Sequence, residues 1–457
     1  MDFVMDKIVL FFQRKKAASL TLIFASFMLI QLVILRLGNQ AGRGFIMPEH
    51  QELVYYGIQI PVILGFVLRS FVDNRAVKLF SLGVCFTGFW IMLLASEASL
   101  FYLIATGVTV LCLGYTGGCV YYYMSCCADV RHFGLSFGLG YAFAVAVQYL
   151  FQLRFDLKPL LGVIGFFSFA VLVIFLYTEN RVVNSLANRE FTAVPKFKLI
   201  CAVVITVAML MFTSYYNNYI HHLQIASNYT EYNVYSFPRL LMIPGVILFG
   251  FIGDIKKGKL LPVCTLCVTV IALLNALLTG RETYTLNMSL FYLSMSAVIS
   301  YYNLTFTRLA QRTKNPAFWA SAGRITDSAA VLLTFALKFS TLSAVSVLVI
   351  DIAMLSVAIV FMALNGDLNL SSIADKETEK SEPNAEITPG QIREKFGLTP
   401  KEAQVFKELT ETDDKQEAIA LRMNMSVNTL RHHITSIYKK TGVQTRAALC
   451  KLSVTDE

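Results

Sequence analysis

Near the carboxyl end of the chain, apolar side chains recur at helical spacing beside a run of basic and hydrogen-bonding ones. Leu430, Ile434 and Ile437 are four and three residues apart, which predicts the buried stripe of a helix over residues 427–441. The opposite face carries side chains that donate or accept hydrogen bonds: Asn428, Arg431, His432, Thr435 and Lys439. A short helix with an apolar back and a basic front is suited to the major groove of DNA, where such side chains reach base edges.

Upstream residues predict the helices that would support this one. Thr399, Pro400 and Glu402 form a strong helix start, with a threonine cap, proline in the first turn and glutamate at the capping-box position. A second helix is expected over residues 415–423, followed by a turn at Asn424. The segment therefore reads as helix, helix, turn, helix.

The boundaries of the third helix are also marked. It is expected to begin after Ser426, which can cap it, and to end at Gly442. A fourth helix over residues 444–452 would complete an all-α domain spanning 392–457. Basic residues at the far end of the third helix and beyond it suit contacts with DNA phosphates: Lys439, Lys440 and Arg446.

This domain resembles the LuxR/FixJ-type helix-turn-helix, and residue types agree over about 55 residues. The matching positions run through the whole module: Leu398, Thr399, Pro400, Glu402, Val405, Ile419, Ala420, Ser426, Thr429, Leu430, Arg431, His433, Ile437, Tyr438, Lys440, Gly442, Val443 and Arg446. The chain departs from the family at Thr441, where leucine is usual, and in an unusually acidic turn over residues 411–416. Both departures would weaken DNA binding by an isolated domain.

The resemblance implies roles for individual residues. Base edges would be read by Arg431, His432 and Thr435. The DNA backbone would be contacted by a second set: Thr429, His433, Lys439, Lys440 and Arg446. Dimerisation would use apolar residues at and within the last helix: Val443, Ala448, Leu449 and Leu452.

The same residues also allow two other interpretations of this domain, protein binding and a metal site. A charged helix face often means only solvent exposure, so the module could bind another protein instead of DNA. The adjacent His432 and His433 suggest a metal site, but neighbouring residues on a helix point about 100° apart and make poor joint ligands. The agreement across the whole module favours double-stranded DNA, and we expect no metal.

The rest of the chain has the composition of a membrane protein. Of its 457 residues 56% are hydrophobic and 15% are charged, whereas soluble domains average about 45–50% and about 25%. The apolar residues fill the chain from Ala17 to Leu364. A span needs about 20 apolar residues, which predicts about twelve spanning helices. Their expected starts are Ala17, Glu52, Leu79, Leu100, Phe133, Pro159, Leu199, Tyr235, Leu260, Met288, Ala317 and Ser343.

The loops between these spans set the expected orientation. With the N-terminus inside, the inner segments hold 18 lysines and arginines and the outer loops hold 5. This asymmetry follows the positive-inside rule and accounts for much of the net charge of +9. We expect a multi-pass protein of the bacterial inner membrane with both termini in the cytoplasm and residues 1–16 at the interface.

Two loops occupy corresponding positions in the two parts of the membrane region. Residues 73–78 follow the second span and residues 250–259 follow the eighth, and their aspartates are 254 − 73 = 181 residues apart. Gly250, Asp254, Gly258 and Lys259 resemble the loop motif of the major facilitator superfamily. The resemblance implies two six-helix halves, residues 17–178 and 199–364, joined by an inner loop over 179–198. The fourth span lacks the arginine that many proton-coupled members carry, which argues against proton-coupled transport.

Beyond the last span the composition changes abruptly. Residues 365–391 are polar, acidic and rich in serine, glutamate and lysine, which is typical of a flexible linker. About 25 such residues span roughly 25–30 Å on average. The linker would hold the soluble domain near the membrane without fixing its position.

Polar and charged residues within spans are candidates for a ligand site, because such residues are costly in lipid. Arg324 and Asp327 are three residues apart on one helix face, and a self-contained ion pair is about as plausible there as a ligand role. Arg36 and Arg239 could bind an anion or extend to the interface. Asp351, in the middle of the twelfth span, is expected to have a structural partner. The candidates for a pocket that takes an aromatic or anionic small molecule are Arg36, Tyr55, Gln59, Gln148, Arg239, Asn303, Arg324 and Asp327.

These observations predict an all-α chain that acts as a membrane-bound one-component transcription regulator. A small molecule would bind the membrane domain and change how a homodimer of the helix-turn-helix occupies DNA. No hydrolytic or redox constellation, receiver domain or ATP site is visible, so we expect no enzyme and no cofactor. Two alternatives remain: a facilitator-like transporter with a fused regulatory domain, and a membrane scaffold with a protein-binding tail.

Overall fold

The computed structural model describes most of the chain in two compact units, Met1–Leu370 and Ser371–Glu457. The residues described are 12, 15–41, 51–95, 99–153, 158–186, 194–226, 237–277, 284–336, 342–367, 396–411, 416–443 and 449. Among these residues the regular structure is entirely helical, as predicted. Most of the expected interfacial N-terminus, most of the expected linker and nearly all of the expected fourth helix of the soluble domain lie outside them.

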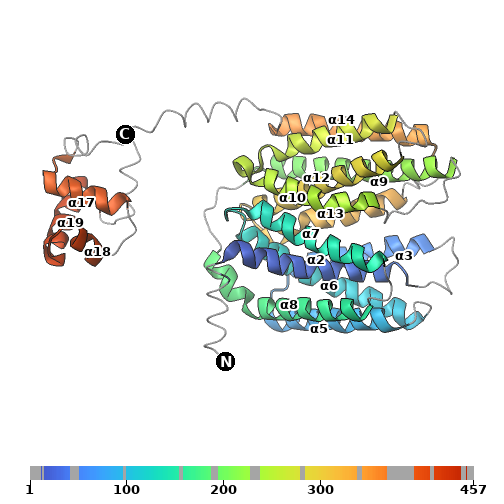
Figure 1. The fold of residues 1–457 in the computed structure, drawn as a ribbon, viewed down its shortest axis with the longest axis horizontal. Coiled ribbons are helices and arrows are strands. Elements are labelled where there is room, and N and C mark those ends of the chain that lie inside the picture. The colour runs from blue at the N-terminus through green and yellow to red at the C-terminus, as the bar shows by residue number, and fades with distance from the viewer. Residues whose placement is uncertain are drawn as a thin grey trace. The chain divides into compact units, whose positions relative to one another are not determined.

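The first unit is a bundle of helices that run side by side (Figure 1). The helices of its amino-terminal half are α2 (Lys16–Gly38), α3 (Gln51–Gly57), α4 (Gln59–Arg69), α5 (Arg75–Leu94), α6 (Leu100–Cys126), α7 (Phe133–Leu153) and α8 (Lys158–Leu186). The helices of its carboxyl-terminal half are α9 (Lys196–Ala226), η3 (Phe237–Leu241), α10 (Met242–Asp254), η4 (Ile255–Gly258), α11 (Leu261–Leu277), α12 (Tyr284–Ala310), α13 (Pro316–Ala336) and α14 (Ala344–Asn365). We call these sets half 1 and half 2.

The helices occur where the sequence predicted spans, but not all of them have the length and hydropathy of a span. Among the described residues, eight helical stretches are long and apolar enough to cross a membrane. The second predicted span is divided between α3 and α4, and α11 is short. Asn287 and Asn303 are buried within α12, and Arg324 and Asp327 lie in α13, so these two helices cross the bundle with polar groups turned inward.

The ends of several helices carry the caps that their sequences suggest. The Asn74 side chain accepts a hydrogen bond from Ala76 N at the start of α5, at 2.8 Å. Ser99 Oγ accepts one from Tyr102 N at the start of α6, at 3.1 Å. At the end of α14, Gly366 adopts a left-handed conformation with φ 77°, which ends the helix before the acidic segment begins.

The two halves meet most closely where α7 packs on α10, and α13 packs on α4 and α6. A Cβ atom added to Gly134 of α7 would overlap the carbonyl oxygen of Gly250 in α10, and one added to Gly250 would overlap the carbonyl oxygen of Gly134. Glycine is therefore required on both sides of this crossing. Two backbones can approach this closely only where neither carries a side chain.

Substituting Gly134 by alanine is expected to lower the stability of the membrane unit by about 1–3 kcal/mol, because the added methyl group must push α7 away from α10. Thermal unfolding of the purified chain in detergent would measure the change. Gly107→Ala is the matched control, since nothing lies within 4 Å of its added Cβ. Equal unfolding temperatures for the two variants would show that the crossing tolerates a side chain.

The second unit contains α17 (Pro400–Glu411), α18 (Gln416–Arg422) and α19 (Val427–Thr441). Their inward side chains form one core: Leu398, Val405, Phe406, Leu409, Ile419, Ala420, Leu430, Ile434, Ile437 and Leu449. The stripe predicted on the third helix is confirmed, because Leu430 and Ile437 are 0% exposed. Asn424 has a φ of 54°, which makes the turn between α18 and α19.

Candidate functional site

The amino-terminal end of α19 is held in place by local hydrogen bonds. Ser426 Oγ accepts from Thr429 N at 3.1 Å and lies 2.7 Å from the Thr429 hydroxyl. The predicted cap is therefore confirmed. Thr429 is exposed at the first turn, where backbone N–H groups and a hydroxyl point outward. A phosphate oxygen of DNA is the kind of group that such a helix start receives.

The face of α19 opposite the core is open to solvent. Arg431, His432, Thr435 and Lys439 are exposed, and His433 is partly buried. The Arg431 guanidinium donates to Gln416 Oε1 of α18 through Nε at 3.3 Å, and Thr435 Oγ1 donates to the Arg431 carbonyl at 2.9 Å. The exposed bond to Gln416 can exchange for a bond to a base edge, and the NH groups of Arg431 remain for bidentate pairing with guanine.

A buried carboxylate ties α17 to α19. Glu402 is 4% exposed and closes the capping box, since its Oε2 accepts from Thr399 N at 2.7 Å. It also accepts from Ser436 Oγ at 2.6 Å and from Lys440 Nζ at 2.7 Å. Burial alone would raise the pKa of Glu402, but the hydrogen bonds from Lys440, Ser436 and Thr399 outweigh it and lower the pKa to about 2. The carboxylate thus fixes the angle at which α19 is presented.

This network changes the expectation for one basic residue. Lys440 was predicted to contact phosphate, yet its ammonium group is paired with Glu402 and its side chain is 33% exposed. Lys439, one residue earlier, is exposed. We therefore expect Lys439 to carry the phosphate contact at this end of α19, while Lys440 holds the helix.

Glu402→Gln is expected to destabilise the soluble unit at neutral pH by roughly 2 kcal/mol, the scale of hydrogen bonds to a charged group. The pKa of Glu402 is about 2 in the folded chain against an ordinary value of 4.5, so its contribution is present above pH 4.5. It is lost as the pH falls from 4.5 toward 2. Hydrogen exchange of α17 and α19 in the full chain would measure the difference. A difference between the variant and the original chain that stayed constant from pH 7 to pH 2 would contradict this.

The other predicted residues of the soluble unit include some that the structure does not describe and some that it places in the core. Arg446, Ala448 and Leu452 lie outside the described residues. Leu449 is fully buried in the core of its own domain, so it is not on a surface that a second copy could contact. Thr441, at the position where leucine is usual, donates its hydroxyl to the Ile437 carbonyl at 2.7 Å. This bond satisfies the one polar group that the substitution brings to the helix.

In the membrane unit, the predicted pair on α13 forms an ion pair. Arg324 NH1 lies 2.7 Å from Asp327 Oδ2 and donates to the Tyr302 hydroxyl of α12 at 3.0 Å. Tyr302 in turn donates to Asp327 Oδ2 at 3.4 Å. Arg324 Nε has no hydrogen-bond partner among the described residues. The hydrogen-bonding capacity of the pair is therefore met only in part, and the Nε donor of Arg324 is available to another group.

Residues of half 1 surround this pair. Tyr121 of α6 and Tyr141 of α7 are buried and lie close enough to Arg324 and Asp327 to interact electrostatically. The Tyr121 hydroxyl has no hydrogen-bond partner within the described part of the chain. Sequence reasoning did not select these two tyrosines for the site, because buried aromatics are usual in membrane helices and their positions gave no separate signal.

A second contact joins the halves through two predicted residues. Arg239 of η3 donates to Gln148 Oε1 of α7 at 2.8 Å, and Gln148 Nε2 donates to the Leu32 carbonyl of α2 at 3.4 Å. Tyr141 lies within electrostatic range of Arg239 as well as of the ion pair. The structure thus brings Gln148, Arg239, Arg324 and Asp327 to one region between the halves.

The structure describes the remaining candidates only in part. Asn303 is buried, donates to the Ile299 carbonyl at 2.8 Å, and has no described partner for its Oδ1. Gln59 and Arg36 are partly buried, and the side chain of Tyr55 lies outside what the structure describes. Asp351 is 1% exposed, and its Oδ1 has no hydrogen-bond partner among the described residues, so its expected structural partner stays a prediction.

The two corresponding loops, residues 73–78 and 250–259, make different contacts. Asp73 pairs with Lys78 at 2.6 Å and with Arg69 at 3.4 Å, and Glu179 of α8 joins the same buried basic groups at 2.8 and 3.2 Å. All of these residues belong to half 1. Sequence reasoning noted the loop but not Glu179, whose place at the end of the sixth span was the available signal.

The second loop reaches across to half 1. Asp254 accepts hydrogen bonds from Gly134 N at 2.6 Å and Leu135 N at 2.8 Å, at the first turn of α7. A carboxylate at a helix amino terminus is stabilised by the free N–H groups and the helix dipole. Arg308 of α12 lies 3.6 Å from the same carboxylate. Asp254 therefore fastens half 2 to half 1 at one end of the bundle.

Within the described residues, no group of three His, Cys, Asp or Glu side chains is placed to hold a metal ion. The arrangement instead offers two kinds of chemistry. The exposed face of α19 can form hydrogen bonds and ion pairs with a polyanion. The region between the halves gathers buried and partly buried polar and aromatic side chains from both halves, including Arg324, Tyr121 and Tyr302.

Comparison with known proteins agrees with part of this description. No curated protein matches the chain. The crystal structure of the E. coli fucose:proton symporter is similar over 76% of this chain and 97% of that chain, with 12% identity and a TM-score of 0.45. Residues 397–453 match the model of the family described as bacterial regulatory proteins, luxR family. The carboxyl-terminal unit of this all-α membrane protein therefore contains a LuxR-type helix-turn-helix domain.

Proposed function

We propose that the chain is a membrane-bound one-component transcription regulator of the bacterial inner membrane, with both termini in the cytoplasm. The observation that carries the proposal is the exposed basic face of α19, in a LuxR-type domain on the same chain as a bundle of membrane-spanning helices. The domain supplies DNA binding, and the bundle supplies a place where a signal can be received. The protein acts without an enzymatic step.

The signal is a small molecule that binds between the halves. A ligand shifts a conformational equilibrium only by its difference in affinity for the two states. Residues from both halves meet around Arg324, Asp327 and Gln148, so a ligand held there contacts both halves in one state and not in the other. Arg324 Nε and the Tyr121 hydroxyl, which have no hydrogen-bond partner among the described residues, favour a ligand that accepts hydrogen bonds, such as an anion or a polar aromatic molecule.

The output is a change in DNA occupancy. The contact between Asp254 and the start of α7 must break if the halves separate at that end. Movement there would change how the tethered domains of two chains pair on a repeated or palindromic site. LuxR-type domains that bind as homodimers would make occupancy depend steeply on that pairing.

Binding and occupancy can be tested on the full chain in lipid nanodiscs. A gel-shift assay with DNA from upstream of the gene should show a specific complex, and candidate aromatic and anionic metabolites should shift its midpoint. Arg324→Ala and Arg239→Ala should weaken the metabolite effect while leaving DNA binding without metabolite intact. A ligand response that was unchanged in both variants would remove these residues from the site.

A transporter with a fused regulatory domain is the second candidate. The observation that favours it is the set of contacts that close one end of the bundle, Asp254 with α7 and Gln311 with Ser125 at 2.7 Å. Such contacts between halves are what an alternating opening would break. Accumulation of a labelled substrate in proteoliposomes would support transport, and its absence with intact DNA binding would favour the regulator.

A further inference from the structure

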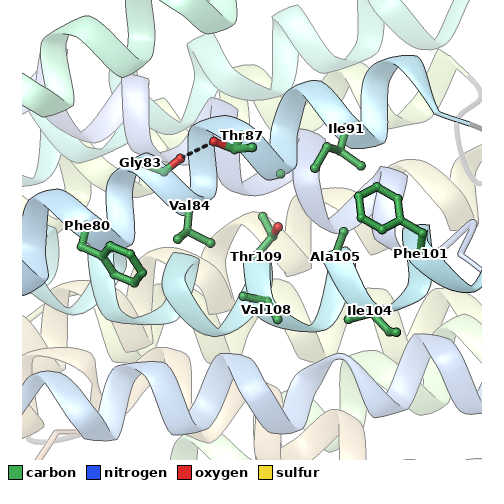
Figure 2. Close-up of a pocket in the computed structure, with 11 residues that line it drawn as sticks. Phe80, Gly83, Val84, Thr87, Ile91, Phe101, Ile104, Ala105, Val108 and Thr109 are labelled. Atoms are coloured by element: carbon green, nitrogen blue, oxygen red, sulfur yellow. Dashed lines mark hydrogen bonds between the residues drawn. The ribbon is translucent and has the colours of Figure 1, made fainter.

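A hollow of about 520 Å³ lies between α5 and α6 (Figure 2). Its lining includes Phe80, Gly83 and Ile91 from α5 and Phe101, Ile104 and Val108 from α6. Several of these large side chains are strongly exposed, with Phe80 at 70% and Ile104 at 59%. The volume falls within the range of small-molecule sites, about 300–1,000 Å³. We call this hollow the α5–α6 groove.

The groove forms because residues with small or no side chains lie at its floor. Nothing lies within 4 Å of a Cβ placed on Gly83, so the space over this residue is open. Behind it the helices touch, since a Cβ on Gly88 would overlap the Thr109 side chain. The Thr87 hydroxyl donates to the Gly83 carbonyl at 3.0 Å and is therefore satisfied within α5 (Figure 2). The exposed lining is thus almost wholly apolar.

The groove continues along α5. A second hollow shares Thr87, Ile91 and Phe101 with it and extends to Leu94 and Ala95 at the end of the helix. From Phe80 to Leu94 is 14 residues, or about 21 Å at the helical rise. The hydrocarbon core of a bilayer is about 30 Å thick, so one lipid tail, reaching about half of that depth, can lie along the groove.

The surroundings decide what fills this space. Both α5 and α6 have the length and hydropathy of membrane-spanning helices, so their exposed faces meet lipid hydrocarbon. A helix of a second chain is about 10 Å across with its side chains. Phe80 stands at one end of the groove and Phe101 at the other (Figure 2), which leaves less room for a rigid cylinder than for a flexible chain.

We propose that the α5–α6 groove is a binding site for one acyl chain of a membrane phospholipid. The chain enters near Leu94 and Ala95 and lies along the groove over Gly83 toward Phe80. Among the described residues, none with a charged side chain lines either hollow, so recognition is of the tail and the headgroup stays outside. The site lies on half 1 and is distinct from the region between the halves.

The test uses the full chain in vesicles that contain a phosphatidylglycerol with a photoreactive diazirine on one acyl chain. After illumination, mass spectrometry should find adducts concentrated on residues 80–109. Gly83→Phe places a ring over the floor of the groove, where an added Cβ has no other atom within 4 Å, and should remove most of these adducts. Gly107→Phe is the matched control, because Gly107 also has open space but does not line the groove, and it should leave the adducts in place.

A second readout does not depend on that substitution. Trp90 borders the second hollow, and Trp319 is the other tryptophan of the chain. In a Trp319→Phe background, phosphatidylglycerol with brominated tails should quench Trp90 fluorescence at a low fraction of total lipid. Quenching that rises only in proportion to that fraction, or adducts spread evenly over all lipid-facing helices, would overturn the proposal. Cross-linking of Gly83→Cys to a second chain would instead place a second copy in the groove.

Discussion

Arg431→Ala is expected to weaken binding of the full chain to its specific DNA site by about ten-fold to hundred-fold, the loss of one bidentate base contact. Arg431 is exposed on α19, and its Nε donates an exposed hydrogen bond to Gln416, a partly buried residue. The substitution removes the guanidinium without disturbing the core, because Leu430 and Ile434 beside it are unchanged. Discrimination between the specific site and random DNA should fall by the same factor.

Gel shifts with specific and random DNA would measure both affinities. Lys401→Ala is the matched control, since Lys401 is an exposed basic residue on α17 and not on α19. Lys439→Ala should weaken specific and random binding alike and lower the salt dependence by about one unit. An Arg431→Ala chain with full specificity would show that α19 does not read bases.

Asp327→Leu is expected to destabilise the membrane unit by about 3–5 kcal/mol, because it leaves the buried Arg324 without its counter-charge. The Arg324 side chain is 11% exposed and that of Asp327 is 25% exposed, so water screens the pair only in part. Tyr302 can still accept one hydrogen bond from Arg324 but cannot balance its charge. Thermal unfolding of the purified chain in detergent would report the loss.

The double replacement Arg324→Met and Asp327→Leu separates stability from function. Replacing both partners of a buried ion pair with apolar side chains is often neutral or stabilising. The double variant should therefore recover most of the stability that Asp327→Leu loses, yet fail to respond to ligand. If the double variant were as unstable as the single one, the pair would matter through its contacts with Tyr302 and not through charge balance.

The soluble domain shows what local sequence can specify. The spacing of Leu430, Ile434 and Ile437 predicted the buried stripe of α19, and the capping box of Thr399 and Glu402 formed as expected. These features depend on residues three or four apart. The pairing of Glu402 with Lys440 joins residues 38 apart, and nothing in the local pattern distinguishes it from two solvated charges.

In the membrane unit, too, the sequence predicts local features but not the contacts between distant residues. Hydropathy located the helices, because the requirement for about 20 apolar residues acts within each segment. The bond between Gln148 and Arg239 spans 91 residues, and the one between Asp254 and Gly134 spans 120. The sequence marked Gln148 and Arg239 as polar residues within spans and Asp254 as part of a loop motif, but it did not show their partners, because the packing of whole helices decides which faces meet.

We propose that the membrane unit controls where and when α19 contacts the chromosome. Chromatin immunoprecipitation of the full chain from growing cells tests this control most directly. Enrichment is expected at discrete sites, with loss of that enrichment in Arg431→Ala and altered occupancy in the Arg324→Met, Asp327→Leu double variant. Discrete enrichment that ignored every substitution in the membrane unit, or no enrichment at all, would contradict it.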